Sequence, residues 1–368
     1  MINKKHFKNK ISLALTIIAS LLLTACTNLP VPRVDEYKIG VIAPLSGFGA
    51  IFGESYLKGA ELALEETDTK IQLITQDSKF EGKASIDAAN FLLNVENVDV
   101  LNALFHLPAQ SVSDLAKNQK TPFIYEAYTR SMLDDNPYAF KAHFDAMEGC
   151  EQLMQYANEN SHYKKIGVLM AQTEYNQLCL EGMKKVEPNI QEHWYSFGTT
   201  DFKTLLTKMN YEGIDSLMTV MIDFEYAAMF KQLTELGYPM KVMCATASEC
   251  IYPQIESDIP AEVLNGTLAI DFIPPRIRET AMGKKYLAKH PQASFVELNY
   301  AVTGYEMIKY TSKALESCKS GEKECITAAL KNIKNYGSIL GSSGFKDRVL
   351  QVENKLYSYL DGIWSEVK

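Results

Sequence analysis

The chain alternates short apolar segments with longer segments in which apolar residues recur every three to four positions. The first pattern is typical of buried strands and the second of amphipathic helices. In the first half, the expected strands lie at 37–43, 71–75, 98–105 and 122–125, and the expected helices at 54–66, 83–95 and 109–118. This strand–helix order predicts a parallel sheet with helices on both faces.

The same alternation restarts near Met147. The expected helices lie at 147–158, 175–186, 202–210 and 226–236, and the expected strands at 166–170, 193–197, 216–220 and 241–244. Two consecutive α/β units predict two lobes, each a doubly wound parallel sheet. Such sheets bind ligands at the carboxyl ends of their strands, so two facing lobes would form a cleft.

The N-terminus has the layout of an export signal. Four lysines without an acidic residue precede the apolar run Ile11–Leu23, which is short for a membrane span, and Leu23-Thr24-Ala25-Cys26 follows. These four residues resemble a bacterial lipobox, so we expect a lipoprotein signal peptide at 1–25, a lipid on Cys26 and a tether at 26–35. An ordinary cleaved signal with a chance cysteine is the alternative. The expected location is the cell envelope, anchored to a bacterial membrane and facing the periplasm or exterior.

The net charge and the motifs of the chain exclude several classes of function. The chain has 37 basic and 45 acidic residues, and removal of 1–25 takes away four lysines, which changes the net charge from −8 to −12. An acidic exported domain is a poor partner for nucleic acid. The glycines of Gly47–Gly53 do not match the dinucleotide spacing and more readily form a loop that exposes backbone N–H groups. We find no metal-binding spacing and no nucleophile–base constellation, so we expect no cofactor, no metal and no enzymatic activity.

Six cysteines remain beside Cys26, an even number for an oxidising compartment. One pair flanks a turn between two helices, one brackets a loop, and one falls near the starts of two helices that would have to pack together. The candidate disulfides are Cys318–Cys325, Cys244–Cys250 and Cys150–Cys179, with buried free thiols as the alternative.

The segment Tyr37–Gly47, with Phe52-Gly53 and Gly59–Ala63 after it, resembles the opening of the leucine/isoleucine/valine-binding family. These are type I periplasmic binding proteins that deliver ligands to ABC transporters. The resemblance implies a Venus-flytrap fold whose lobes close by hinge bending. It places three crossovers near 141–145, 268–274 and 338–344, lobe 1 at 36–142 plus 275–337, and lobe 2 at 143–274 plus 338–368.

The resemblance also implies a function. We expect a lipid-anchored solute-binding protein that captures a small ligand for the permease subunits of an ABC importer. An exported regulatory or scaffold protein that uses the same fold for signalling or protein contact is the alternative.

The ligand anchors of this family are matched only in part. The hydroxyl-rich loop of amino-acid-binding relatives is replaced by 105–110, Thr129 and Tyr175 match, and the expected acid falls near Thr246, with Glu249 close by. The aromatic residues at strand ends favour a ring-bearing or partly apolar ligand, and an amino-acid-like ligand stays open. The expected ligand contacts are Phe48, Phe52, Phe105, His106, Pro108, Ala109, Tyr128, Thr129, Tyr175, Asp223, Glu225, Thr246 and Glu249.

Overall fold

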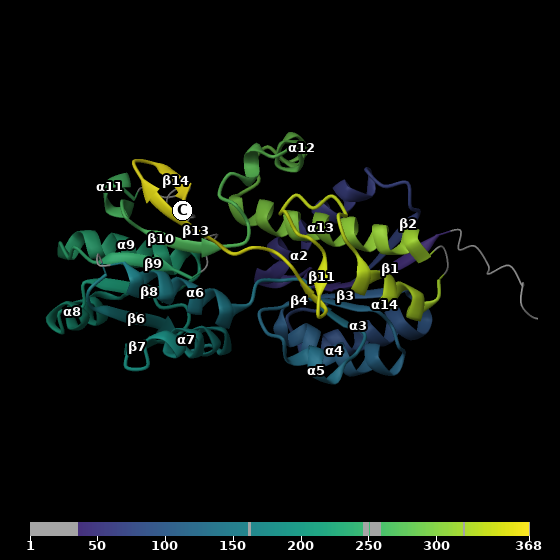
Figure 1. The fold of residues 1–368 in the computed structure, drawn as a ribbon, viewed down its shortest axis with the longest axis horizontal. Coiled ribbons are helices and arrows are strands. Elements are labelled where there is room, and N and C mark those ends of the chain that lie inside the picture. The colour runs from purple at the N-terminus through teal and green to yellow at the C-terminus, as the bar shows by residue number, and fades with distance from the viewer. Residues whose placement is uncertain (1–35, 161–162, 246–249, 251–258, 319–320, 368) are drawn as a thin grey trace, which may run out of the picture. The chain divides into compact units, whose positions relative to one another are not determined.

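A computed structural model describes residues 36–160, 163–245, 250, 259–318 and 321–367. The predictions for the signal peptide at 1–25, the lipidated Cys26 and the tether at 26–35 lie outside the described residues. So do those for Thr246 and Glu249. Within Glu36–Lys368, which is one compact unit, the strands form two sheets (Figure 1).

The first sheet has the strand order β11-β12-β5-β4-β3-β1-β2. Its strands are β1 (Tyr37–Ala43), β2 (Ile71–Asp77), β3 (Val100–Leu104), β4 (Phe123–Glu126), β5 (Ala139–Lys141), β11 (Phe345–Lys346) and β12 (Val349–Leu350). All neighbours are parallel except the edge pair β11–β12, which is antiparallel. We call this sheet and the helices that pack on it the first lobe.

The second sheet has the order β14-β13-β10-β9-β8-β6-β7. Its strands are β6 (Ile166–Ala171), β7 (Gln191–Tyr195), β8 (Ser216–Val220), β9 (Lys241–Cys244), β10 (Leu268–Asp271), β13 (Lys355–Leu360) and β14 (Ile363–Glu366). The strand β13 pairs antiparallel with both β10 and β14, and all other neighbours, including β9 and β10, are parallel. This sheet and its helices form the second lobe.

The helices flank both sheets. In the first lobe they are η1 (Gly47–Gly49), α2 (Ala50–Leu64), α3 (Gly82–Asn90), η2 (Phe91–Val95), α4 (His106–Asn118), α5 (Ser131–Asp135), η3 (Ile277–Glu279), α12 (Ala281–Lys289), α13 (Phe295–Cys318) and α14 (Lys323–Asn332). In the second lobe they are α6 (Ala146–Glu159), α7 (Glu174–Val186), α8 (Lys203–Tyr211), α9 (Asp223–Leu236) and α11 (Ala261–Leu264). Among the described residues, none of these helices combines the length and the apolar character that a bilayer crossing requires.

The two faces of the first sheet are covered by different helices. Helices α3, α4 and α5 lie on one side and supply buried residues to a shared apolar core, while α2 and α13 lie on the other side (Figure 1). The helices α2 and α13 pack closely because glycine occupies the crossing. A Cβ atom at Gly59 would clash with the carbonyl oxygen of Ala301, and one at Gly304 with that of Tyr56. In the second lobe, α6 and α7 build the core on one face of the sheet.

The sequence located most elements to within a few residues, and the fold class is confirmed as two α/β sheets with flanking helices. The structure corrects two of the expected crossovers. The hairpin Phe345–Leu350 pairs with β5 and extends the first sheet, so 338–350 stays with the first lobe and the chain passes to β13 through 351–354. The strand β10 occupies 268–271, which we expected to be a crossover, because its backbone pairs with β9.

Each pair of cysteines expected from the sequence is disulfide-bonded in the structure. Cys150–Cys179 joins α6 to α7, Cys244–Cys250 follows β9, and Cys318–Cys325 joins α13 to α14.

Candidate ligand-binding site

Aromatic rings gather where β1, β2 and β3 end. The ring centroids of Phe52 and Tyr300 lie 4.9 Å apart, those of Phe80 and Phe105 4.7 Å apart, and those of Phe52 and Phe105 5.7 Å apart. Phe48 stacks on Phe80 at 5.1 Å and is 81% exposed. We call Phe48, Phe52, Phe80, Phe105 and Tyr300 the aromatic cluster. It presents apolar surface at the strand ends where α/β sheets bind ligands.

The loops that carry this cluster contain one hydrogen-bonded carboxylate and two unusual backbone conformations. Asp77, the last residue of β2, accepts hydrogen bonds from the backbone N–H of Leu45 at 2.8 Å and of Lys79 at 2.9 Å. Phe80 and Phe105 have φ angles of 58° and 69°, a region that bulky side chains rarely adopt. Such strain persists only where surrounding contacts hold it, and it concentrates at functional sites.

Polar groups of the two lobes meet beside the cluster. His106 begins α4 directly after Phe105, and its Nε2 lies 3.2 Å from Oε1 of Glu174 at the start of α7. The Tyr128 hydroxyl donates to the other oxygen of Glu174 at 3.3 Å. The rings of His106 and Tyr128 lie 5.1 Å apart. The structure therefore brings together two predicted residues and Glu174, which sequence reasoning missed.

Tyr175 faces both lobes. Its ring makes an edge contact with Tyr128 at 5.1 Å, and it also packs against the apolar core of the second lobe. The residue is half-buried, so its ring has a structural role beside any contact with a ligand.

Three predicted contacts are corrected by the structure. Both oxygens of Glu225 are used inside the second lobe, where they accept from the Tyr195 hydroxyl at 3.0 Å and the Gly198 N–H at 2.7 Å. Glu225 is 1% exposed, so it fixes the start of α9 instead of meeting a ligand. Pro108 and Ala109 lie in the first turn of α4 and are buried, because the helix begins earlier than expected and turns them toward the core.

The remaining predicted residues are placed only in part. Thr129 Oγ1 accepts from the N–H of Ser131 at the start of α5, at 3.2 Å. Asp223 begins α9. Neither Phe80 nor Tyr300 was predicted from the sequence. Phe80 could have been suspected because it follows the end of β2, whereas Tyr300 lies inside the helix α13 and gave no such signal.

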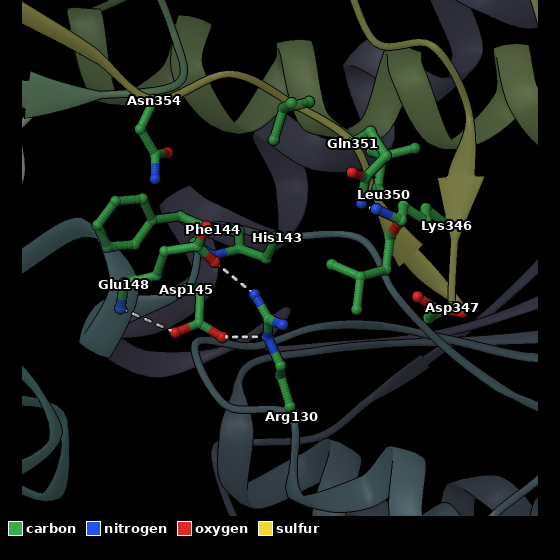
Figure 2. A pocket seen from close by; sticks show the side chains of 12 residues that line it. Arg130, His143, Phe144, Asp145, Glu148, Lys346, Asp347, Leu350, Gln351 and Asn354 are labelled. Atoms are coloured by element: carbon green, nitrogen blue, oxygen red, sulfur yellow. Dashed lines mark hydrogen bonds and ion pairs between the residues drawn. The ribbon is translucent and has the colours of Figure 1, made fainter. Parts of the chain in front are cut away.

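A cavity of about 240 Å³ lies beside the crossovers, away from the aromatic cluster. Figure 2 shows Arg130 pointing toward Asp145 and Glu148 at its wall. The Arg130 Nε donates to Asp145 at 2.8 Å, and its terminal nitrogen pairs with Glu148. Lys346 contributes to the lining from the hairpin of the first lobe. The Arg130 guanidinium at this cavity is thus already paired with two carboxylates.

Residues 36–359 match the model of a family described as periplasmic binding protein. The chain belongs to this family. The family predicted from Tyr37–Gly47 is thus confirmed, and because its members are binding proteins of transport systems, the chain is not an enzyme. Family membership also implies a location outside the cytoplasm and association with ABC transporters.

Similarity to individual known proteins is consistent with this family. "Leu/Ile/Val-binding protein homolog 2" of Brucella abortus is 22% identical over 324 residues, which cover 84% of this chain and 86% of that protein. Two solved structures share the fold. The branched-chain amino acid transporter substrate-binding protein of Streptococcus pneumoniae, in complex with isoleucine, has a TM-score of 0.74 at 18% identity and covers 90% of this chain and 99% of its own. A solute-binding protein from Rhodopseudomonas palustris, in complex with 3,4-dihydroxybenzoic acid, has a TM-score of 0.74 at 20% identity, with 91% and 96% coverage.

Proposed function

We propose that this periplasmic binding protein is anchored by a lipid on Cys26 and captures a small acid with an apolar or ring-bearing body for an ABC importer. The observation that carries the proposal is the juxtaposition of the aromatic cluster with the donors His106 and Tyr128. The cluster ends at Phe105, and His106 is the next residue. A ligand that combines an acidic group with apolar surface matches both features.

The aromatic cluster supports the apolar part of this ligand. Phe52 and Phe105 are half-buried and already in ring contact with Tyr300, so a ligand would extend an existing apolar surface. Apolar burial contributes about 25 cal/mol per Å², and aromatic contacts add about 0.5–1.5 kcal/mol each. These terms supply most of the affinity of a small-molecule site, while a few polar groups fix orientation.

The polar groups support the acidic part. The Tyr128 hydroxyl and His106 Nε2 both point toward acceptor oxygens in the structure. The proteins from S. pneumoniae and R. palustris were solved with isoleucine and 3,4-dihydroxybenzoic acid, and each of these ligands combines a carboxyl group with an apolar body. Both compounds are therefore suitable probes for this chain.

A thermal-shift screen of the mature chain tests the proposal. The screen contains benzoate, 3,4-dihydroxybenzoate, isoleucine and leucine, together with neutral and cationic metabolites of similar size. A ligand at 100 times its Kd adds about 2.7 kcal/mol to the free energy of unfolding, which shifts the melting temperature measurably. We expect stabilisation by at least one acid with an apolar body. Stabilisation by none of these acids would contradict the proposal and favour the regulatory or scaffold alternative.

A further inference from the structure

Glu174 connects the two lobes through a single carboxylate. It is the first residue of α7, in the second lobe, and its two oxygens face two groups of the first lobe. Oε1 lies 3.2 Å from His106 Nε2, and Oε2 accepts the Tyr128 hydroxyl at 3.3 Å. His106 follows β3 and Tyr128 follows β4, so the fold brings two donors from different strands to one carboxylate.

The donors and the acceptor differ in burial. The side chain of His106 is 8% exposed and its ring packs on Tyr128, whereas the side chain of Glu174 is 60% exposed. Burial, and then the nearby Glu174 carboxylate, raise the pKa of Tyr128, so the phenol keeps its proton and donates. The His106 side chain is thus buried, whereas the Glu174 carboxylate is open to solvent.

Only one edge of the His106 ring is engaged. Its Nδ1 is buried and has no hydrogen-bond partner among the residues that the structure describes. Recognition by His106 therefore runs through Nε2. Removal of Glu174 without a replacement would leave the buried His106 side chain and the Tyr128 hydroxyl without their acceptor, which is costly, whereas exchange for another carboxylate would keep both contacts.

We propose that Glu174 is an internal competitor of the ligand: its carboxylate occupies the place in which His106 and Tyr128 hold the acidic group of an incoming ligand. This inference rests on the proposed function and deepens it. On capture, the ligand carboxylate takes over both contacts, and Glu174 moves into solvent. The site then selects acids over neutral compounds of the same shape, because a neutral group cannot displace a carboxylate from two donors.

Glu174→Gln tests this exchange. The amide keeps the size of the side chain, but only its oxygen can accept a hydrogen bond, and its NH₂ group opposes the second donor. Glu181→Gln is the matched control, because Glu181 lies on the same helix and is exposed. Benzoate and benzamide are the probes, since they share a ring and differ in charge. Titration calorimetry measures both dissociation constants for the wild-type chain and the two variants.

We expect Glu174→Gln to tighten benzoate binding about tenfold and to leave benzamide binding unchanged. The tenfold figure applies if Glu174 occupies the site in about nine of ten wild-type molecules, because only the remaining tenth is then free to bind. Glu181→Gln should match the wild type with both probes. Benzoate binding that is unchanged or weaker in Glu174→Gln, while the wild type still binds acids, would overturn the inference and leave the proposed function standing. If neither the wild type nor Glu174→Gln binds benzoate or any other acid of the screen, the proposed function fails as well.

Discussion

The buried ammonium of Lys141 donates to the backbone carbonyl oxygen of Phe144 at 2.8 Å. The same nitrogen also donates to the carbonyl of His143, so one lysine at the end of β5 holds the segment that leads into α6. Lys141 is fully buried, and burial lowers its pKa to about 8. The entry to the second lobe therefore depends on a charge inside the first.

A buried acid lies in the same region. Glu126 ends β4, and its Oε1 accepts from the hydroxyls of Tyr56 at 3.3 Å and Tyr310 at 3.4 Å. Burial raises the pKa of Glu126 to about 8, although the charge of Lys141 opposes this rise. The acid and the base are thus both disfavoured in their charged forms, which makes the folding free energy depend on pH.

The sign of this dependence differs for the two groups. The raised pKa of Glu126 stabilises the fold below about 4.5, and this contribution is lost as the pH rises to about 8. The lowered pKa of Lys141 gives a contribution that is present above about 10.5 and is lost as the pH falls to about 8. We predict a minimum near pH 8 in the contribution of this pair to the free energy of unfolding.

Urea titrations from pH 4.5 to 10.5 measure the dependence. Glu126→Gln should remove the fall below pH 8 and Lys141→Met the rise above it, whereas Lys331→Met, at an exposed position of α14, should change neither limb. Equal pH profiles for the wild type and both buried variants would show that the two groups titrate as they do in the unfolded chain.

Phe52→Leu should weaken binding of a ring-bearing acid. Phe52 belongs to the ring contacts with Phe105 and Tyr300, and leucine keeps an apolar side chain there but has no ring to stack against benzoate. We therefore expect a loss of about 0.5–1.5 kcal/mol in the binding free energy of benzoate. Tyr211→Ala is the control, because Tyr211 is 92% exposed on α8. Calorimetry on variants with native melting behaviour provides the measurement. The same dissociation constant for Phe52→Leu and the wild type would exclude the aromatic cluster from the ligand site.

The disulfides should differ in their effect on stability. Cys150–Cys179 closes a longer loop than Cys318–Cys325, with sequence separations of 29 and 7. Chain-entropy arguments give about 3–4 kcal/mol for the former and about 2–3 kcal/mol for the latter. Replacement of each pair by alanine, followed by denaturant unfolding, tests the order. A larger loss for the Cys318–Cys325 pair would mean that native packing, not loop length, sets the contribution.

Cys26→Ala should release the protein from membranes or stall its processing. The basis is the Leu-Thr-Ala-Cys sequence after the apolar run, since several acyl chains on one cysteine anchor a protein stably, whereas a single chain binds marginally. Fractionation of cells that express the wild type and the variant measures the effect. Full membrane retention of Cys26→Ala, with normal cleavage, would exclude the lipid anchor.

The fold could be predicted from sequence because strands and helices have different periods, which bound most elements to within a few residues. The shortest strands could not be predicted: β5 and β12 are three and two residues long, too short for a period to be visible. Their pairing is decided by distant backbone partners, which explains why the expected crossover at 338–344 was placed too early.

The sequence could predict only those site residues that directly follow the end of a strand. Phe52, Phe105, His106 and Tyr128 follow strands of the first lobe, and the rings of Phe52 and Phe105 and those of His106 and Tyr128 are in contact. The role of Glu225 was misjudged because its partners, Tyr195 and the Gly198 N–H, lie on another strand and loop. Glu174 gave no signal in the sequence, since an acid at a helix start is ordinary until the opposite lobe supplies its donors.

A crystal structure of the mature chain with the acid that binds most tightly in the screen tests the central claim most directly. We predict the acidic group within hydrogen-bond distance of His106 Nε2 and the Tyr128 hydroxyl, the apolar body against Phe52 and Phe105, and the Glu174 carboxylate turned to solvent. A ligand bound in the cavity beside Arg130, with Glu174 still contacting His106 and Tyr128, would contradict the account.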